Sequence, residues 1–101
     1  MPEVQKIACV NDAGFVMSFY VEIAGGLRTE STGNYPIDQS ETIDLGSFPI
    51  AQGTEIWPVV HAVLGKTESG SPHVNFAENG QTATYEVKGT TLDFSVGLIG
   101  Q

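Results

Sequence analysis

The stretch FVMSFYVEI, residues 15–23, decides the fold class of this chain. Its odd positions are all apolar, whereas the even positions include Ser18 and Glu22. Alternation with a period of two is typical of a β-strand that turns one face towards a core, because successive side chains point to opposite faces. The stretch therefore predicts a half-buried strand. No long window elsewhere sustains the 3.6-residue period of a helix.

The segments before this strand and near the C-terminus predict two hairpins. Residues 4–10 are short and rich in β-branched side chains, and residues 11–14 (NDAG) suit a turn that leads into residues 15–23. Further along, Asn79-Gly80 joins residues 74–78 to residues 81–87. This dipeptide is preferred in type I′ turns, whose two central residues both need positive φ. A two-residue loop there would place Phe76 opposite Ala83.

The rest of the chain supplies further strands and one long connection. Residues 54–64 are apolar on both parities, which predicts a strand covered on both faces. Pro58 has no N–H to donate and should therefore lie at an edge or beside a bulge. Residues 92–98 alternate as a final strand, and residues 42–45 form a shorter candidate. Residues 24–41, rich in Gly and Thr, predict a loop or an excursion along an edge.

These segments predict an all-β fold, a small antiparallel β-sandwich of about seven short strands, with a small β-barrel as the alternative. A chain of 101 residues and 10.7 kDa has room for one hydrophobic core. We therefore expect a single sandwich domain over residues 1–101. The single cysteine excludes an intramolecular disulfide, so packing must supply the stability.

The charge and hydropathy patterns exclude several partners. Twelve acidic residues against four basic ones give a net charge of -8, which repels nucleic acid at long range. No apolar run approaches the roughly 18 residues of a membrane-spanning helix. The first residues lack the basic start and apolar stretch of a secretory signal. We predict no nucleic-acid partner and no transmembrane segment. Two locations stay open: the cytoplasm, or release without a recognisable signal.

The residues that could carry chemistry are few and scattered. Cys9 lies on an apolar strand, where a free cysteine usually acts as a small buried hydrophobe. His61 and His73 are in neither a zinc-ligand spacing nor a nucleophile motif. The acidic residues between positions 38 and 44 do not match a calcium loop. We expect no enzymatic activity, no metal site and no cofactor.

Aromatic side chains outside the expected core are the best candidates for binding. Tyr35 in the 24–41 loop and Trp57 in the central strand would stack on a sugar ring or on a partner's apolar surface. Asn34 and Asp38 would bond to sugar hydroxyls. These four residues form the predicted site of a non-catalytic, lectin-like or surface-binding module, with a carbohydrate or a protein surface as partner.

Two other functions are compatible with the same sequence. The scarcity of lysines, which commonly protect sheet edges, fits a structural protein that self-assembles through its edges into a homo-oligomer. A small membrane-active sandwich of the toxin type would instead place Phe48, Trp57 and Tyr35 in the lipid interface. Against this third function, the sequence shows neither an amphipathic helix nor the basic patch that attracts anionic lipid.

Overall fold

The computed structural model describes residues 2–100, and all of their regular elements are β-strands. The predicted all-β class and small sandwich are confirmed. Six strands have five or more residues and four have two or three. None of the described residues forms a helix that could cross a membrane. The strands are β1 (Glu3–Val4), β2 (Lys6–Asn11), β3 (Met17–Ile23), β4 (Leu27–Arg28), β5 (Ser40–Asp44), β6 (Glu55–Ala62), β7 (Thr67–Ser69), β8 (Val74–Phe76), β9 (Thr82–Thr90) and β10 (Asp93–Gly100).

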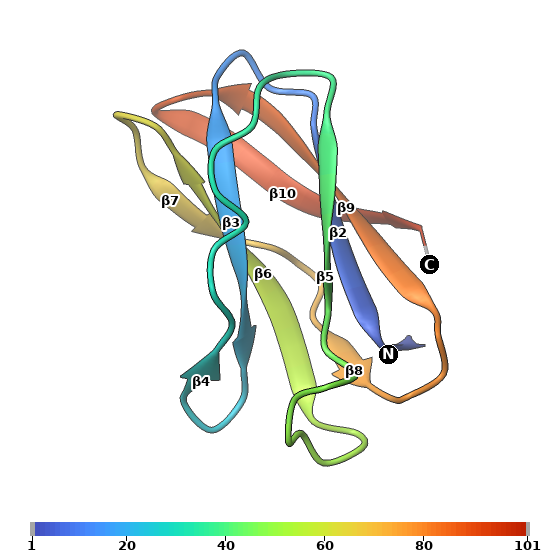
Figure 1. Ribbon diagram of the computed structural model, residues 1–101. Coiled ribbons are helices and arrows are strands. Elements are labelled where there is room, and N and C mark those ends of the chain that lie inside the picture. The colour runs from blue at the N-terminus through green and yellow to red at the C-terminus, as the bar shows by residue number, and fades with distance from the viewer. Residues whose placement is uncertain (1, 101) are drawn as a thin grey trace.

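The strands form two sheets that face each other (Figure 1). The larger sheet has the order β1-β8-β6-β3-β4, with β7 also paired to β6, and the smaller has the order β10-β9-β2-β5. Antiparallel pairing was expected throughout, whereas each sheet contains one parallel pair, β1 with β8 and β2 with β9. Both parallel pairs join strands that are far apart in sequence, because the chain repeatedly changes sheet between neighbouring strands.

The turn after β2 crosses between the sheets, so the hairpin predicted for residues 4–23 is wrong. Asn11, a fully buried polar residue, holds the crossing. Its Nδ2 donates to the carbonyl oxygens of Phe15 at 2.8 Å and Tyr35 at 3.3 Å, and its Oδ1 accepts the N–H of Ala13 at 3.0 Å. One side chain thus satisfies backbone groups that a hairpin ladder would otherwise pair.

The segment around Asn79-Gly80 also changes sheet, and the predicted pairing of Phe76 with Ala83 is wrong. Only Gly80 has a positive φ, 73°, whereas a type I′ turn needs positive φ at both central residues. The Asn79 side chain instead accepts the N–H of Gln81 at 3.0 Å and donates to a carbonyl of β1 at 2.9 Å. The flanking strands β8 and β9 consequently lie in opposite sheets.

The core lies between the sheets, and β3 contributes to it as its alternation predicted. Met17, Phe19, Val21 and Ile23 are all buried. The opposing sheet supplies the large side chain of Tyr85, whose hydroxyl donates to the Pro72 carbonyl. A buried tyrosine needs such a partner, because an unpaired hydroxyl in the interior costs free energy.

The central strand β6 is covered on both faces over only part of its length. Val59 and Val60 point to opposite faces and are both buried, whereas Trp57 is half-buried and His61 is exposed. Pro58 is not at a sheet edge, because β6 has neighbours on both sides. It lies where β7 ends and β8 has not yet begun, and its carbonyl accepts the N–H of Gly70 at 2.8 Å. The missing N–H of Pro58 therefore falls in a gap of the ladder.

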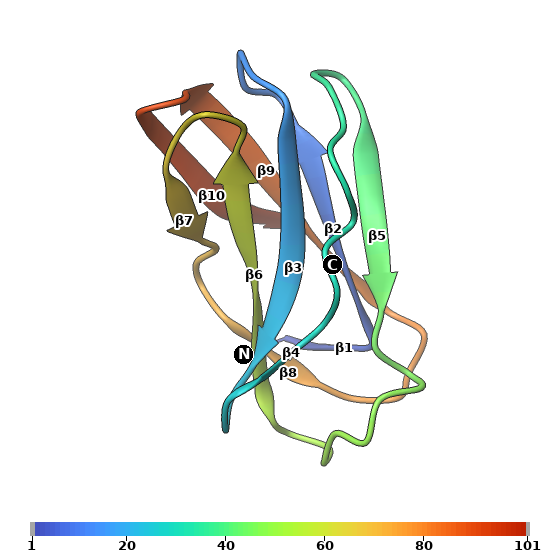
Figure 2. The same cartoon turned by 60° about the vertical axis from the view of Figure 1, so that its left-hand side comes forward.

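Residues 29–39, within the predicted 24–41 loop, form an excursion along the edge of β3 and then join the other sheet (Figure 2). Tyr35 exchanges two backbone hydrogen bonds with β3, and the N–H of Thr29 donates to a carbonyl of the same strand. The hydroxyls of Thr29 and Thr32 accept further N–H groups of that strand. Asp38 then bonds to the backbone of Asn11, before β5 pairs with β2. The segment thereby covers an edge of the larger sheet that would otherwise be open.

Candidate functional site

Tyr35, the predicted stacking residue of the 24–41 loop, lies in the core. Its side chain is 4% exposed, and its hydroxyl donates to the Cys9 carbonyl at 2.8 Å. Burial raises the pKa of the Tyr35 hydroxyl well above its usual range. The expectation that this ring is offered to a ligand or to a lipid interface is wrong, because the hydrogen bond to Cys9 lets the whole ring be buried.

The remaining predicted residues do not come together. Asn34 and Asp38 are exposed, and Asp38 has a positive φ of 70°. They flank Tyr35, which pairs with Met17 at one end of β3, whereas Trp57 pairs with Glu22 near the other end. At about 3.4 Å per residue, the step from Met17 to Glu22 separates the two groups by about 17 Å. A single site made of Asn34, Tyr35, Asp38 and Trp57 is therefore wrong.

Trp57 lies on the outer face of the larger sheet, where it meets residues that sequence reasoning did not group with it. Its ring stacks on the His73 ring, with centroids 4.1 Å apart and planes 8° from parallel. His73 Nδ1 is 2.5 Å from Glu55 Oε1. On β3, the Tyr20 ring carries the Arg28 guanidinium 5.1 Å above its centroid. His73 directly precedes β8, and the pairing of β6 with β8 brings it to Trp57.

A second candidate lies at the end of the molecule where the β6–β7 and β9–β10 turns meet. Figure 1 shows the two turns side by side, and the N–H of Lys66 donates to the carbonyl of Thr91 at 3.1 Å. Leu64 and Leu92 sit in these turns with 96% and 74% of their surfaces exposed. We call this pair of side chains the leucine tip. The apolar surface of these two side chains is largely exposed to solvent and contributes almost no burial to the core.

The approach of the two turns depends on Gly65. A Cβ at this position would lie 2.4 Å from the Thr91 carbonyl oxygen, so a larger residue would push the turns apart. Leu64 beside it has a positive φ of 59°. For a residue with a side chain, the left-handed region costs about 1–2 kcal/mol. A strained and almost fully exposed leucine is the kind of position at which function is commonly found.

Both leucines were expected in strands, and both expectations are wrong. The apolar run 54–64 ends at Ala62 as a strand, so Leu64 falls in the turn that follows. The alternation of residues 92–98 holds for Phe94 and Val96, which are buried, but β10 begins only at Asp93 and leaves Leu92 in a turn. The periodic pattern runs on past the end of each strand, which is why it did not reveal the tip.

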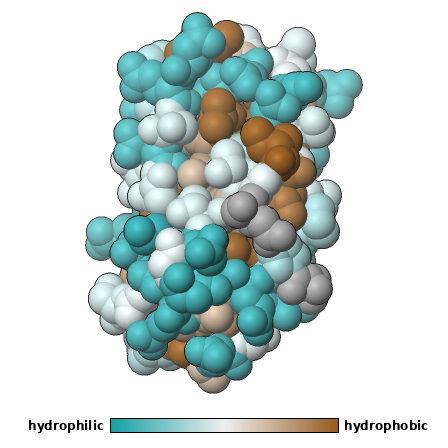
Figure 3. All heavy atoms as spheres, turned by 90° about the vertical axis from the view of Figure 1, so that its right-hand side faces the viewer, coloured by the Kyte–Doolittle hydropathy of each residue, from teal (hydrophilic) through white to brown (hydrophobic). Residues whose placement is uncertain are grey.

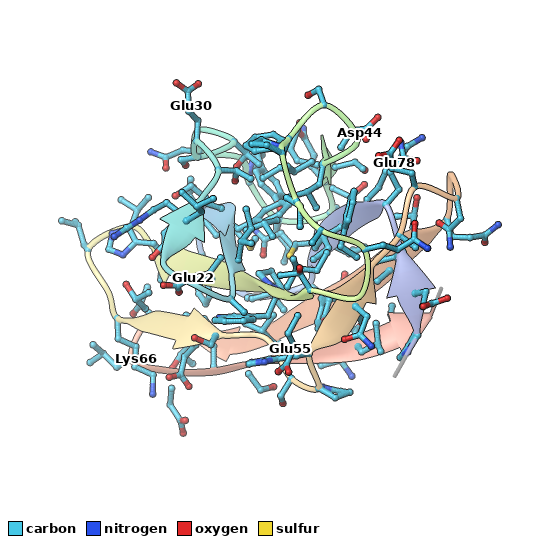
Figure 4. The ribbon with its side chains drawn as sticks, turned by 90° about the horizontal axis from the view of Figure 1, so that it is seen from below. Glu22, Glu30, Asp44, Glu55, Lys66 and Glu78 are labelled. Carbon is cyan, nitrogen blue, oxygen red and sulfur yellow. The ribbon has the colours of Figure 1, made fainter. Side chains whose placement is uncertain are left out.

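The acidic and nucleophilic groups form no reactive cluster among residues 2–100. Cys9 is fully buried, and desolvation raises its pKa well above the ordinary range, as expected for a small hydrophobe. No three potential metal ligands gather in this part of the chain. Figure 4 shows the labelled carboxylates of Glu22, Glu30, Asp44 and Glu78 spread around the molecule. The expectations of no enzyme and no cofactor stay predictions.

Solved structures with a similar all-β domain belong to much larger proteins. The chain resembles pneumolysin with a TM-score of 0.52 at 12% identity, over 95% of this chain and 23% of that one. Listeriolysin O matches with a TM-score of 0.50 at 13% identity, covering 95% and 22%. Intermedilysin, solved with human CD59, matches with 0.50 at 17%, covering 95% and 24%. No family model and no curated protein matches the chain. At these identities the likeness concerns the fold alone.

Proposed function

We propose that this chain is a non-catalytic binding module that docks on a lipid surface through the leucine tip. The observation that carries the proposal is the pairing of two exposed leucines on neighbouring turns, one of them at positive φ. Single exposed leucines are common on protein surfaces. Two exposed leucines on turns that are hydrogen-bonded to each other offer apolar surface that an environment outside the chain can bury.

The expected affinity is modest. Full burial of one leucine side chain is worth about 1.5–3 kcal/mol, so the pair supplies at most about 3–6 kcal/mol. This is of the order of a single fatty acyl anchor, whose membrane binding is weak and reversible. The net charge of -8 disfavours anionic headgroups. We therefore propose a zwitterionic surface as the partner.

The structural comparisons support this proposal only coarsely. Intermedilysin, one of the proteins with a similar domain, is a human-specific toxin and was solved with human CD59. This chain spans less than a quarter of the length of intermedilysin or of pneumolysin. A toxin-like β-domain agrees with the fold of these proteins, and the proposed docking itself rests on the leucine tip.

Flotation with phosphatidylcholine vesicles tests the proposal. We expect the unmodified chain to float with the vesicles and the double variant Leu64→Asn, Leu92→Asn to stay in the dense fraction. Leu27→Asn is the matched control, because Leu27 is 57% exposed in β4, at the opposite end of β3. Equal flotation of the double variant and the unmodified chain would refute the proposal. Equal loss in Leu27→Asn would also count against it.

Self-assembly through sheet edges stays a prediction. The outer edge of β5 carries Glu41 and Asp44 on a strand whose side chains are nearly all exposed. Figure 3 shows the molecule from the side of the smaller sheet, where hydrophobic patches lie among hydrophilic residues. At the other margin of the same sheet, Ser71 already bonds to the backbone of β10 at Val96 and Leu98. The β5 edge is therefore the candidate for pairing, and its carboxylates oppose it.

A further inference from the structure

A second surface with binding chemistry lies on the outer face of the larger sheet, away from the leucine tip. The register aligns Trp57 of β6, Glu22 of β3 and Arg28 of β4 in one row. His73 extends this row beyond Trp57 through the ring stack, and Tyr20 lies beside it under the Arg28 guanidinium. We call these five residues the aromatic row. All of them lie outside the core.

Much of the hydrogen-bonding capacity of the aromatic row is unused within residues 2–100. Arg28 is directed over the Tyr20 ring and makes no ion pair with Glu22 in this part of the chain. Among the described residues, neither the Tyr20 hydroxyl nor the Trp57 indole N–H has a hydrogen-bond partner. Neither of these two side chains is fully buried. Donors and a carboxylate acceptor are thus open beside flat apolar rings.

This combination fits a ligand with one apolar face and a rim of hydroxyl groups. A pyranose ring has that shape: its C–H face stacks on an aromatic ring, and its hydroxyls both donate and accept hydrogen bonds. The described surface holds no enclosed pocket, so the ligand must be bound on an open face. The net charge of -8 repels polyanionic glycans. We propose that the aromatic row binds a neutral pyranose of a glycan.

The aromatic row is separate from the leucine tip. Val63, next to Leu64, bonds to the backbone of Val16, whereas Trp57 lies opposite Glu22. At about 3.4 Å per residue, the step from Val16 to Glu22 is about 20 Å. Substitutions in one surface should therefore leave the other intact, since sites more than about 10 Å apart without shared partners behave independently.

The test combines a glycan array with a fluorescence titration. The array carries neutral and acidic glycans, and each neutral oligosaccharide that binds is then titrated in solution against the fluorescence of Trp57, the single tryptophan. We expect Trp57→Ala to abolish array binding and His73→Ala to weaken the solution affinity about tenfold, the equivalent of about 1.4 kcal/mol. His61→Ala is the matched control, because His61 is exposed on the same face without a ring partner.

The outcomes separate this proposal from the lipid-docking one. The variant Leu64→Asn, Leu92→Asn should bind the oligosaccharide as the unmodified chain does, and Trp57→Ala should still float with phosphatidylcholine vesicles. Binding of a neutral glycan only when it is displayed on a glycolipid would support the same pyranose site with a membrane source. If no neutral glycan on the array bound, the proposal would be overturned. Binding of acidic glycans alone, or equal losses in His61→Ala and His73→Ala at unchanged melting temperatures, would also overturn it.

Discussion

Leu64→Gly should stabilise the fold and weaken lipid docking, two effects that are rarely expected from one substitution in a turn. Leu64 is 96% exposed and has a φ of 59°. Removing its side chain loses almost no burial, and glycine adopts positive φ without the steric cost that other residues meet. The two quantities to be measured are the free energy of unfolding and the vesicle partition constant.

The magnitude for stability follows from two opposing terms. Relief of the left-handed conformation gains about 1–2 kcal/mol, and the greater freedom of glycine in the unfolded chain takes back about 0.5–1 kcal/mol. The free energy of unfolding should therefore rise by about 0.5–1 kcal/mol. For a domain of this size, 1 kcal/mol corresponds to about 4–8 °C in melting temperature. The rise should be a few degrees.

The magnitude for docking follows from the apolar surface that is lost. Removing one of two leucines takes away about 2 kcal/mol of burial in the lipid, which corresponds to roughly thirtyfold weaker partition. Leu92→Gly is the matched comparison, because Leu92 is exposed in the partner turn but is not among the residues with positive φ. It should weaken docking to a similar extent while lowering the free energy of unfolding.

Urea unfolding followed by Trp57 fluorescence and flotation with phosphatidylcholine vesicles measure the two quantities on the same samples. A fall in the unfolding free energy for Leu64→Gly would refute the argument that Leu64 is strained. Unchanged partition in both glycine variants would refute the leucine tip as the docking surface. A loss of partition in Leu92→Gly alone would show that Leu64 is exposed for some other reason.

Three further outcomes follow from the core and the sheet edges. Tyr35→Phe removes the bond to the Cys9 carbonyl and should cost about 1–2 kcal/mol, a fall in melting temperature of several degrees; an unchanged value would contradict the role given to this hydroxyl. Burial raises the pKa of Cys9, Tyr35 and Tyr85 from ordinary values of 9.0, 10.0 and 10.0, so the folded chain keeps protons that the unfolded chain releases. Stability is then full below about pH 9, falls by about 1.4 kcal/mol per pH unit as Cys9 ionises in the unfolded chain, and falls more steeply above about pH 10, where the two tyrosines ionise as well. Urea midpoints that stay flat from about pH 8 to 11 would contradict this. Finally, sedimentation should give a monomer at low salt, with any pairing through β5 growing as salt shortens the screening length to about 8 Å; a monomer at every salt concentration removes self-assembly.

The sequence was most informative where one strand meets one core. The alternation of residues 15–23 predicted β3 and its four buried side chains, because a strand buried on one face has an apolar residue at every second position. Asn79 was correctly placed outside the strands, whereas Asn11 is the last residue of β2, and both residues were assigned to hairpins. A side chain that closes a tight turn and one that satisfies a crossing between sheets are chemically the same, so local residues do not distinguish them.

The candidate site was harder to predict, because its members meet through long-range pairing. Trp57 was singled out as an exposed aromatic, yet its partner His73 comes from a segment that only the β6–β8 register brings near. The prediction that Tyr35 is exposed was wrong for a related reason. Its hydroxyl finds the Cys9 carbonyl only after residues 29–39 have run along β3 and crossed to the other sheet. Exposure of an aromatic in a loop depends on where that loop is folded.

Leu64 and Leu92 illustrate how a disagreement between pattern and fold can point to function. Each continues an apolar pattern beyond the last residue of its strand, and the turn geometry then places the side chain in solvent. Local rules favour a polar residue, or glycine at Leu64, in such turns. Chains whose local preferences agree with the global fold are the ones that fold well, and departures concentrate at sites that serve another purpose. Two departures of the same kind, joined by the bond from Lys66 to Thr91, are better explained by one shared apolar partner than by two separate accidents.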